Sequence, residues 1–116
     1  MLDLVALPGA LRAEHLDGRI VVVFEVLRAT TTIAAALSAG VSEIRIFGDV
    51  ESARAAAASR DGPHLLCGEV RCLPPPGFDL GNSPGAFEAA RHSGRMLFMA
   101  TTNGTRAIVA AASASQ

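Results

Sequence analysis

The sequence contains no tryptophan and no tyrosine, and aromatic residues make up only 4% of its 116 residues. A hydrophobic core must therefore be built mainly from Ala, Val, Leu and Ile. Such a core favours helices that pack closely against a sheet. Half of the residues are hydrophobic, so the chain is long and apolar enough for one domain of ordinary size.

The sequence also lacks a block of basic residues, and its formal net charge is −1. This composition argues against a nucleic-acid partner, which would require a patch that neutralises phosphates. No apolar run is long enough for a transmembrane helix, so we expect no membrane partner. An early acidic residue, Asp3, and no basic stretch at the N-terminus predict that there is no signal peptide and that the protein is cytoplasmic.

Cysteine is scarce, with only Cys67 and Cys72. Few cysteines in a cytosolic chain favour free thiols over a disulfide. His64 and the two cysteines are possible metal ligands by residue type, but their spacing matches no strong zinc pattern. Cys67 ends an apolar run, and we interpret it as a small core residue.

One stretch, residues 20–37, organises the chain. Its first part, residues 20–24, is Ile-Val-Val-Val-Phe, which is typical of a strand buried on both faces of a parallel sheet. Its last part, residues 33–37, favours a helix. The polar residues between them are Glu25, Arg28, Thr30, Thr31 and Thr32. Ligands of open α/β sheets bind where such a turn follows a strand, and a helix N-terminus favours an anion.

A simpler interpretation of this turn is that one threonine only caps the helix. Threonine is a good N-cap residue, and a cap needs a single hydroxyl. The turn holds three hydroxyls beside Arg28 and Glu25. We therefore favour binding of a phosphate or carboxylate over capping alone.

The rest of the chain alternates between strand and helix patterns. Strands are predicted over 43–47, 64–67 and 95–100, and helices over 50–59, 85–93 and 106–115. Right-handed crossovers between such units build a mainly parallel sheet with helices on both faces. The sequence therefore predicts an α/β fold of three layers, α/β/α.

A long loop, residues 68–84, separates the third predicted strand from the next helix. Loops of this length inside a compact domain are usually functional or disordered. Its polar residues are Glu69, Arg71, Asp79, Asn82 and Ser83. Alternatively, Ser83 and Pro84 only start the next helix as its N-cap and first residue. That interpretation does not account for Glu69 or Asp79.

A second polar turn follows the strand predicted over 95–100. It contains Thr102, Asn103 and Gly104, and Gly104 would let the backbone approach a ligand closely. A plain turn capped by Thr105 explains the same residues equally well. Because every polar cluster follows a strand, we expect all of them to gather on one edge of the sheet.

These residue types suit phosphoryl hydrolysis with a divalent metal. Carboxylates and substrate phosphates hold Mg²⁺, and arginine stabilises charge on the transferred group. The candidate metal ligands are Glu25, Glu69 and Asp79, and the candidate catalytic residues are Arg28, Glu69 and Asp79. The candidate substrate-binding residues are Thr30, Thr31, Thr32, Asn82, Ser83, Thr102, Asn103 and Gly104. A phosphate- or nucleotide-binding module without catalysis is the alternative.

Three stretches resemble one family. Residues 25–33 (Glu-Val-Leu-Arg-Ala-Thr-Thr-Thr-Ile), residues 76–84 and residues 101–106 are similar to motifs of the 2-phosphosulfolactate phosphatases, often called ComB. The family usually carries Asp where this chain has Glu25. The resemblance implies Mg²⁺-dependent hydrolysis of a small acidic phosphorylated substrate, 2-phosphosulfolactate, to sulfolactate and phosphate. In the family's namesakes this is a step of coenzyme M biosynthesis.

Members of the family are longer than this chain. We therefore expect residues 1–116 to form a single α/β domain that is the N-terminal part of a longer phosphatase. A sheet of this size leaves an edge strand unpaired, and an exposed edge is a template for association. The chain is thus expected to form a homo-oligomer or to be an inactive fragment on its own.

Overall fold

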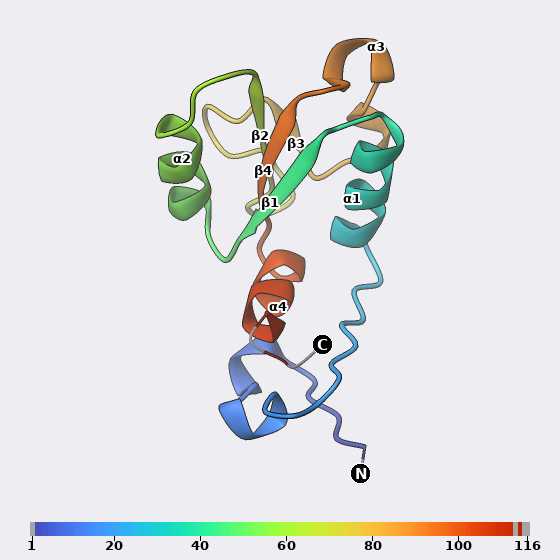
Figure 1. The fold of residues 1–116 in the computed structure, drawn as a ribbon, viewed down its shortest axis with the longest axis vertical. Coiled ribbons are helices and arrows are strands. Elements are labelled where there is room, and N and C mark those ends of the chain that lie inside the picture. Colours follow the sequence, from blue (N-terminus) through green and yellow to red (C-terminus); the bar gives the residue numbers. More distant parts are fainter. Residues whose placement is uncertain (1, 113, 115–116) are drawn as a thin grey trace.

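A computed structural model describes residues 2–112 and residue 114. Its centre is one sheet of four parallel strands in the order β1-β4-β2-β3 (Figure 1). The strands are β1 (Glu43–Phe47), β2 (His64–Gly68), β3 (Leu80–Gly81) and β4 (Met96–Ala100). The predicted α/β class is confirmed, and so is the parallel arrangement.

Helices lie on both sides of this sheet. They are α1 (Ala29–Ser38), α2 (Val50–Ala58), α3 (Ala89–His92) and α4 (Gly104–Ala111), with short 3-10 turns η1 (Pro8–Ala10), η2 (Ala13–His15) and η3 (Pro84–Ala86). Figure 1 shows α1 and α2 on opposite faces, while α4 lies beyond the end of the sheet at which the strands finish. The layers α/β/α are therefore present as predicted.

The core is centred on β4, an inner strand that pairs with β1 on one side and β2 on the other. Leu97, Phe98, Met99 and Ala100 of this strand are all fully buried. Leu97 pairs in register with Ile44 of β1 and with Leu65 of β2. The helices present small side chains to the sheet, and the buried ones are Ala29, Ala36, Ala53 and Ala57. This packing explains how a core with so few aromatic residues is filled.

Local signals set the ends of α1 and α2. The Asp49 carboxylate accepts a hydrogen bond from the Ser52 backbone N–H at 2.7 Å, so Asp49 is the side-chain cap of α2. Gly40, just after α1, has a φ of 83°, which favours glycine. A Cβ at Gly40 would also lie 2.7 Å from the Ser93 hydroxyl oxygen. The start of α2 agrees with the helix predicted over residues 50–59.

The strand predicted over residues 20–24 is absent from the sheet. The segment is extended but pairs with no other described strand, and its alternate side chains, Ile20, Val22 and Phe24, face solvent. The prediction of a strand buried on both faces is therefore wrong for the part of the chain that the structure describes. The β-branched run sets a preference for extended backbone, but a strand also needs neighbours to pair with and to cover it.

Two helices also differ from the prediction. The helix predicted over residues 85–93 is split into η3 and the short α3, because Phe87 and Glu88 are extended. Phe87 packs against the core instead of continuing a helix. The last helix begins at Gly104 rather than residue 106, and part of the range predicted for it lies outside the described residues.

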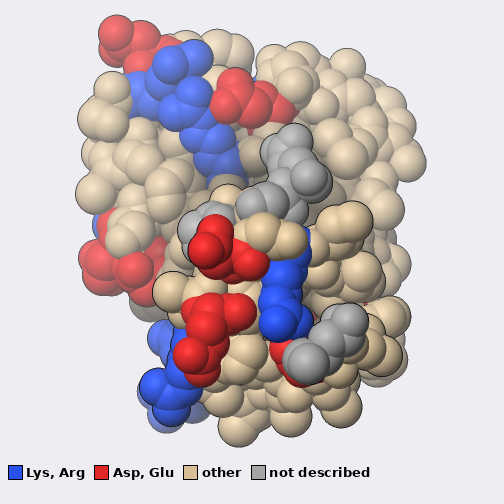
Figure 2. Space-filling model, turned by 60° about the horizontal axis from the view of Figure 1, so that its bottom comes forward, with Lys and Arg blue, Asp and Glu red and all other residues tan. Residues whose placement is uncertain are grey.

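The surface carries acidic and basic side chains in small mixed groups. Figure 2 shows these groups on one face of the molecule and an expanse without charge on the side that carries α1. Within the described residues, no helix is both long and apolar enough to cross a membrane.

Candidate functional site at the carboxyl edge of the sheet

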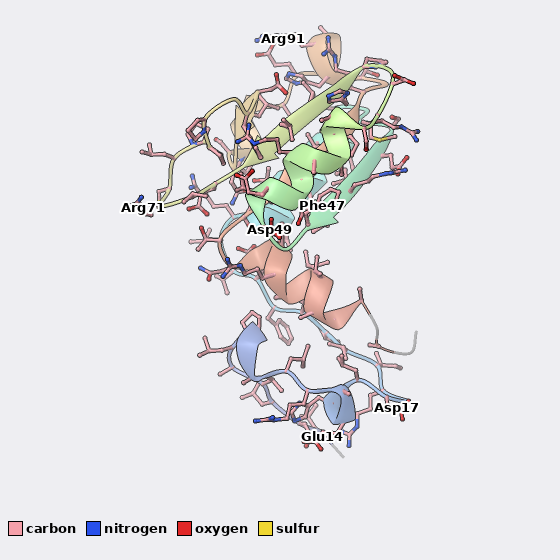
Figure 3. The ribbon with its side chains drawn as sticks, turned by 90° about the vertical axis from the view of Figure 1, so that its left-hand side faces the viewer. Glu14, Asp17, Phe47, Asp49, Arg71 and Arg91 are labelled. Atoms are coloured by element: carbon pink, nitrogen blue, oxygen red, sulfur yellow. The ribbon has the colours of Figure 1, made fainter. Side chains whose placement is uncertain are left out.

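Three strands finish side by side at one edge of the sheet. Gly68 of β2 pairs with Ala100 of β4, and Ala100 pairs with Phe47 of β1. The residues that follow them, Glu69, Thr101 and Gly48, therefore share this carboxyl edge. Figure 3 places Phe47 and Asp49 at the end of the sheet that faces α4, and Arg91 at the opposite end.

Glu69 is held by backbone and hydroxyl donors. One carboxylate oxygen, Oε1, accepts from the Cys72 N–H at 2.6 Å and from the Thr102 hydroxyl at 3.1 Å, and Oε2 accepts from the Thr102 N–H at 3.4 Å. Partial burial disfavours ionisation, but the hydrogen bonds from Cys72 and Thr102 and the charge of Arg28 outweigh it. Together they hold the pKa of Glu69 below its usual value.

Glu25 occupies the N-terminus of α1. Its Oε2 accepts from the Thr30 N–H at 3.1 Å and lies 3.2 Å from the Thr30 hydroxyl, which also donates to the Glu25 carbonyl oxygen at 3.1 Å. The anion at this helix end is thus a carboxylate of the chain itself, which neither sequence interpretation included. Of the other two threonines, Thr31 is exposed and Thr32 is fully buried in the core.

The second turn is braced by a pair of threonines. The Thr105 hydroxyl donates to the Thr101 carbonyl oxygen at 3.0 Å and accepts from the Thr101 N–H at 2.8 Å, while the Thr105 N–H donates to the Thr101 hydroxyl at 3.1 Å. Both side chains are buried. This bracing leaves Thr102 and Asn103 exposed at the edge, where a ligand could reach them.

Gly104 brings the two polar turns together. A Cβ at this position would lie 2.7 Å from the Ala29 Cβ and 3.0 Å from the Glu25 Cγ. Only a residue without a side chain allows α4 to approach the start of α1 this closely. The sequence predicted that Gly104 would approach a ligand, whereas the close neighbours that the structure shows are Ala29 and Glu25 of the chain's own first motif.

A cavity of about 300 Å³ opens at this edge. It is lined by residues that follow the three strands and by the first residues of α2 and α4: Gly48, Asp49, Val50, Glu51, Glu69, Val70, Thr101, Thr102 and Arg106. The Arg106 Nε donates to the Gly48 carbonyl oxygen at 3.1 Å. Hydrogen bonds from the Ser52 backbone and hydroxyl, helped by the charge of Arg106, hold the pKa of Asp49 below its usual value.

Arg106 and Asp49 were not among the predicted site residues. Arg106 is the last residue of the third motif, and its position in the first turn of α4 was the available signal. Asp49 follows β1, and the sequence predicts it both as a helix cap and as one of the polar residues that follow strands, but not as a site residue. The structure shows that it caps α2 and also lines the cavity.

The rest of the predicted set lies apart from this cavity. The Asp79 carboxylate accepts from the Leu66 N–H at 2.8 Å, which places Asp79 beside the middle of β2 rather than at its end. Asn82 is buried, and its Oδ1 has no hydrogen-bond partner within residues 2–112 and 114. Ser83 is exposed and stands at the N-cap position of η3, where its side chain makes no capping hydrogen bond.

The predicted trio of metal ligands is not gathered in one place. Among the described residues no three His, Cys, Asp or Glu side chains lie together as a metal-binding group. Mg²⁺ commonly binds through one or two carboxylates together with substrate phosphates and waters. Glu25 and Glu69 lie close to successive parts of the Thr102–Gly104 turn and fit that arrangement. A cage made from protein ligands alone does not fit.

Cys67 is not suited to act as a nucleophile. Both cysteines are free. Burial raises the pKa of the Cys67 thiol to about 12, so this side chain stays protonated at neutral pH. Its Sγ lies 3.3 Å from the Gly81 carbonyl oxygen and serves as part of the core. The sequence interpretation of Cys67 as a core residue is confirmed.

Fold and candidate site together define an α/β protein with a polar cavity at the carboxyl edge of a parallel sheet, the usual position of ligand sites in this class. The sequence model of one family, 2-phosphosulpholactate phosphatase, matches residues 5–116. The chain therefore belongs to the 2-phosphosulfolactate phosphatase family.

Curated relatives agree with this assignment. A "Probable 2-phosphosulfolactate phosphatase" of Parasynechococcus marenigrum is 53% identical over 88 residues, which are 75% of this chain and 36% of that relative. Proteins with the same name from Symbiobacterium thermophilum and Thermus thermophilus are 46% and 47% identical, over 88% and 80% of this chain and 44% and 38% of their own length. The chain thus spans less than half of the length of these relatives.

Proposed function

We propose that the protein containing these residues is a Mg²⁺-dependent phosphatase that hydrolyses 2-phosphosulfolactate to sulfolactate and phosphate. The observation that carries the proposal is the meeting of the first and third family motifs at the carboxyl edge of the sheet. Glu25 of the first motif lies against Gly104 of the third, and Thr102 of the third binds Glu69. The curated relatives carry the name of this activity.

The anionic substrate would be bound by donors and cations of this edge. Arg28 offers a planar guanidinium that suits a phosphate group, and Arg106 lines the cavity beside Thr101 and Thr102. The N-terminus of α4 adds free backbone N–H groups with a partial positive charge. These groups would position the phosphate and stabilise the charge that develops on it during hydrolysis.

Mg²⁺, when bound, would neutralise phosphate charge and polarise the ester. Glu69 is the residue best suited to hold it, because its lowered pKa keeps the carboxylate ionised at neutral pH. Glu25 is the second candidate. Asp79, the third carboxylate predicted from the sequence, accepts from the Leu66 N–H beside the middle of β2, so we assign it a structural role rather than that of a metal ligand. The free cysteines suit a reducing compartment, so the proposal includes a cytoplasmic location and a place in coenzyme M biosynthesis.

The test is an assay of phosphate release from 2-phosphosulfolactate, with the chain alone and with the chain joined to the remainder of a curated relative. We expect release by the joined protein that requires Mg²⁺ and stops with a chelator. A parallel binding measurement with inorganic phosphate separates the alternative. Phosphate binding without release from any phosphate monoester would identify a non-catalytic binding module and overturn the proposal.

A further inference from the structure

The segment Ile20–Val26 has the exposure pattern of a β-strand although it pairs with nothing. Its even-numbered side chains face solvent, and Phe24 and Val26 are each 86% exposed. The residues between them, Val21, Val23 and Glu25, are half-buried. Exposure that alternates with a period of two is the geometry of a strand with one face covered and the other open.

The backbone of this segment is open as well. Within the described part of the chain, no hydrogen bond joins the backbone of residues 20–24 to any other residue. The nearest contacts flank it, where the Arg19 N–H donates to Leu16 and the Thr30 hydroxyl donates to the Glu25 carbonyl oxygen. Unpaired N–H and C=O groups along an extended apolar segment are a template for further strands.

A large apolar surface results. Five strongly exposed apolar side chains belong to it: Ile20, Val22, Phe24, Val26 and Leu27. The segment that carries them leads directly into α1 (Figure 1). Contiguous exposed apolar patches on a folded protein mark interaction sites rather than ordinary surface.

We propose that Ile20–Val26 is an interior strand of a second sheet, whose other strands are supplied by the remainder of the family fold. Apart from Glu25 near its end, the segment is apolar on both faces, as in strands that are covered on two sides. Such a strand requires a neighbour on each edge and a layer over the open face. A single peptide would pair with one edge only, and so would a second copy of the segment.

The lengths of the relatives identify the source of these strands. The matched residues make up 36% to 44% of the relatives named above, so those proteins carry further polypeptide of the same family fold. That polypeptide is large enough to form a second α/β layer system. We therefore expect this polypeptide to supply the neighbouring strand on each edge of the segment and to cover its open face.

Docking of this kind would place the candidate site between two parts of the protein. The segment contains Glu25, whose side chain packs against Gly104 and binds Thr30. Pairing of the strand would therefore fix Glu25 and Arg28 relative to the cavity. Ligand sites are often found at such junctions. The inference concerns assembly and does not depend on the phosphatase activity proposed above.

Amide hydrogen exchange tests the proposal. The chain is studied at a concentration where sedimentation shows a monomer, alone and with the part of the Symbiobacterium thermophilum relative that lies outside the matched residues. We expect the amides of residues 21–26 to exchange freely in the chain alone and at least about 100-fold more slowly in the mixture. Amides of Leu97, Phe98 and Met99 in the buried strand β4 should be protected in both samples and report that the chain is folded.

A pair of matched variants completes the design. Val22→Lys places a charge on the open face and should remove the protection of the amides of residues 21–26 from exchange. Leu73→Lys changes an equally exposed residue outside the segment and should leave this protection unchanged. Three results would overturn the proposal: no added protection in the mixture, equal protection in the monomeric chain alone, or undiminished protection with Val22→Lys. Loss of phosphate release with protection intact would count against the proposed function only.

Discussion

Thr102 binds the carboxylate of Glu69 through both its backbone N–H and its hydroxyl, although 33 residues separate them. The hydroxyl lies 3.1 Å from Oε1 and 3.3 Å from the Glu69 carbonyl oxygen. This contact joins the loop after β2 to the turn after β4, and it explains why the two strands present their polar residues to the same cavity.

The first prediction concerns this contact. Thr102→Val removes the hydroxyl donor, so the pKa of Glu69 should rise towards its usual value of 4.5. Titration of the Glu69 side-chain carbon by NMR measures the change, and Thr31→Val, at an exposed threonine of α1, is the matched control. A pKa equal to that of the parent chain would show that this hydroxyl does not stabilise the ionised form.

The same shift predicts a dependence of stability on pH. A carboxyl whose pKa is lower in the folded state contributes stability above its unfolded pKa, and this contribution disappears as the pH falls through the folded value. Thr102→Val should therefore weaken the loss of stability below about pH 4.5. The effect is small because Glu69 is largely solvated, and urea unfolding at several pH values measures it.

The second prediction concerns Gly104. Gly104→Ala would place a Cβ 2.7 Å from the Ala29 Cβ. The position of a Cβ is fixed by the backbone, so the new methyl group cannot avoid this contact by rotating. We expect a loss of about 1–3 kcal/mol in the free energy of unfolding, as for overpacking in a core. Gly85→Ala, where no atom lies within 4 Å of the new Cβ, should change little. Equal stability of the two variants in urea would contradict the close approach.

The third prediction concerns Arg28. If Arg28 binds the phosphate, Arg28→Lys replaces a two-pronged planar donor by a point charge and should weaken binding of inorganic phosphate roughly tenfold with little change in stability. Calorimetric titration measures the affinity. Arg91→Lys is the control, because Arg91 lies at the opposite end of the sheet from Asp49 (Figure 3). An unchanged affinity would remove Arg28 from the site.

The fourth prediction separates two carboxylates that the sequence treats alike. Glu69→Gln should abolish the Mg²⁺ dependence while the fold persists, since Glu69 lines the cavity. Asp79→Ala should instead lower the free energy of unfolding by about 1–2 kcal/mol, because the Leu66 N–H loses its acceptor. Mg²⁺ titration and urea unfolding of both variants test the difference. Wild-type Mg²⁺ affinity in the Glu69 variant would defeat the metal assignment.

The sequence predicted the parts of this fold that depend on local signals. Strands β1, β2 and β4 and helix α2 follow from periodicity and from caps such as Asp49, and the convergence of Glu69 with the turn after β4 follows from the parallel order. Pairing is not a local property, so the composition of residues 20–24 indicated an extended backbone but was wrong about their place in the sheet. The hydrogen bond from the Thr30 N–H to the Glu25 carboxylate at the start of α1 also depends on how the chain folds back between these residues, which sequence spacing does not show.

The last prediction follows from the open face of Ile20–Leu27. In the isolated chain these side chains have only solvent or another copy to contact, so at high concentration the chain should associate through them. Sedimentation should show species larger than a monomer, Val22→Lys should shift them to monomer, and Leu73→Lys should not. Phosphate release by the isolated chain should be low, because the segment that contains Glu25 and precedes Arg28 has no neighbouring strand in the described part of the chain to hold it in place. A monomer that remains dispersed at all concentrations and turns over 2-phosphosulfolactate at about 1 per second or faster would contradict this, since that rate is typical of a complete enzyme site.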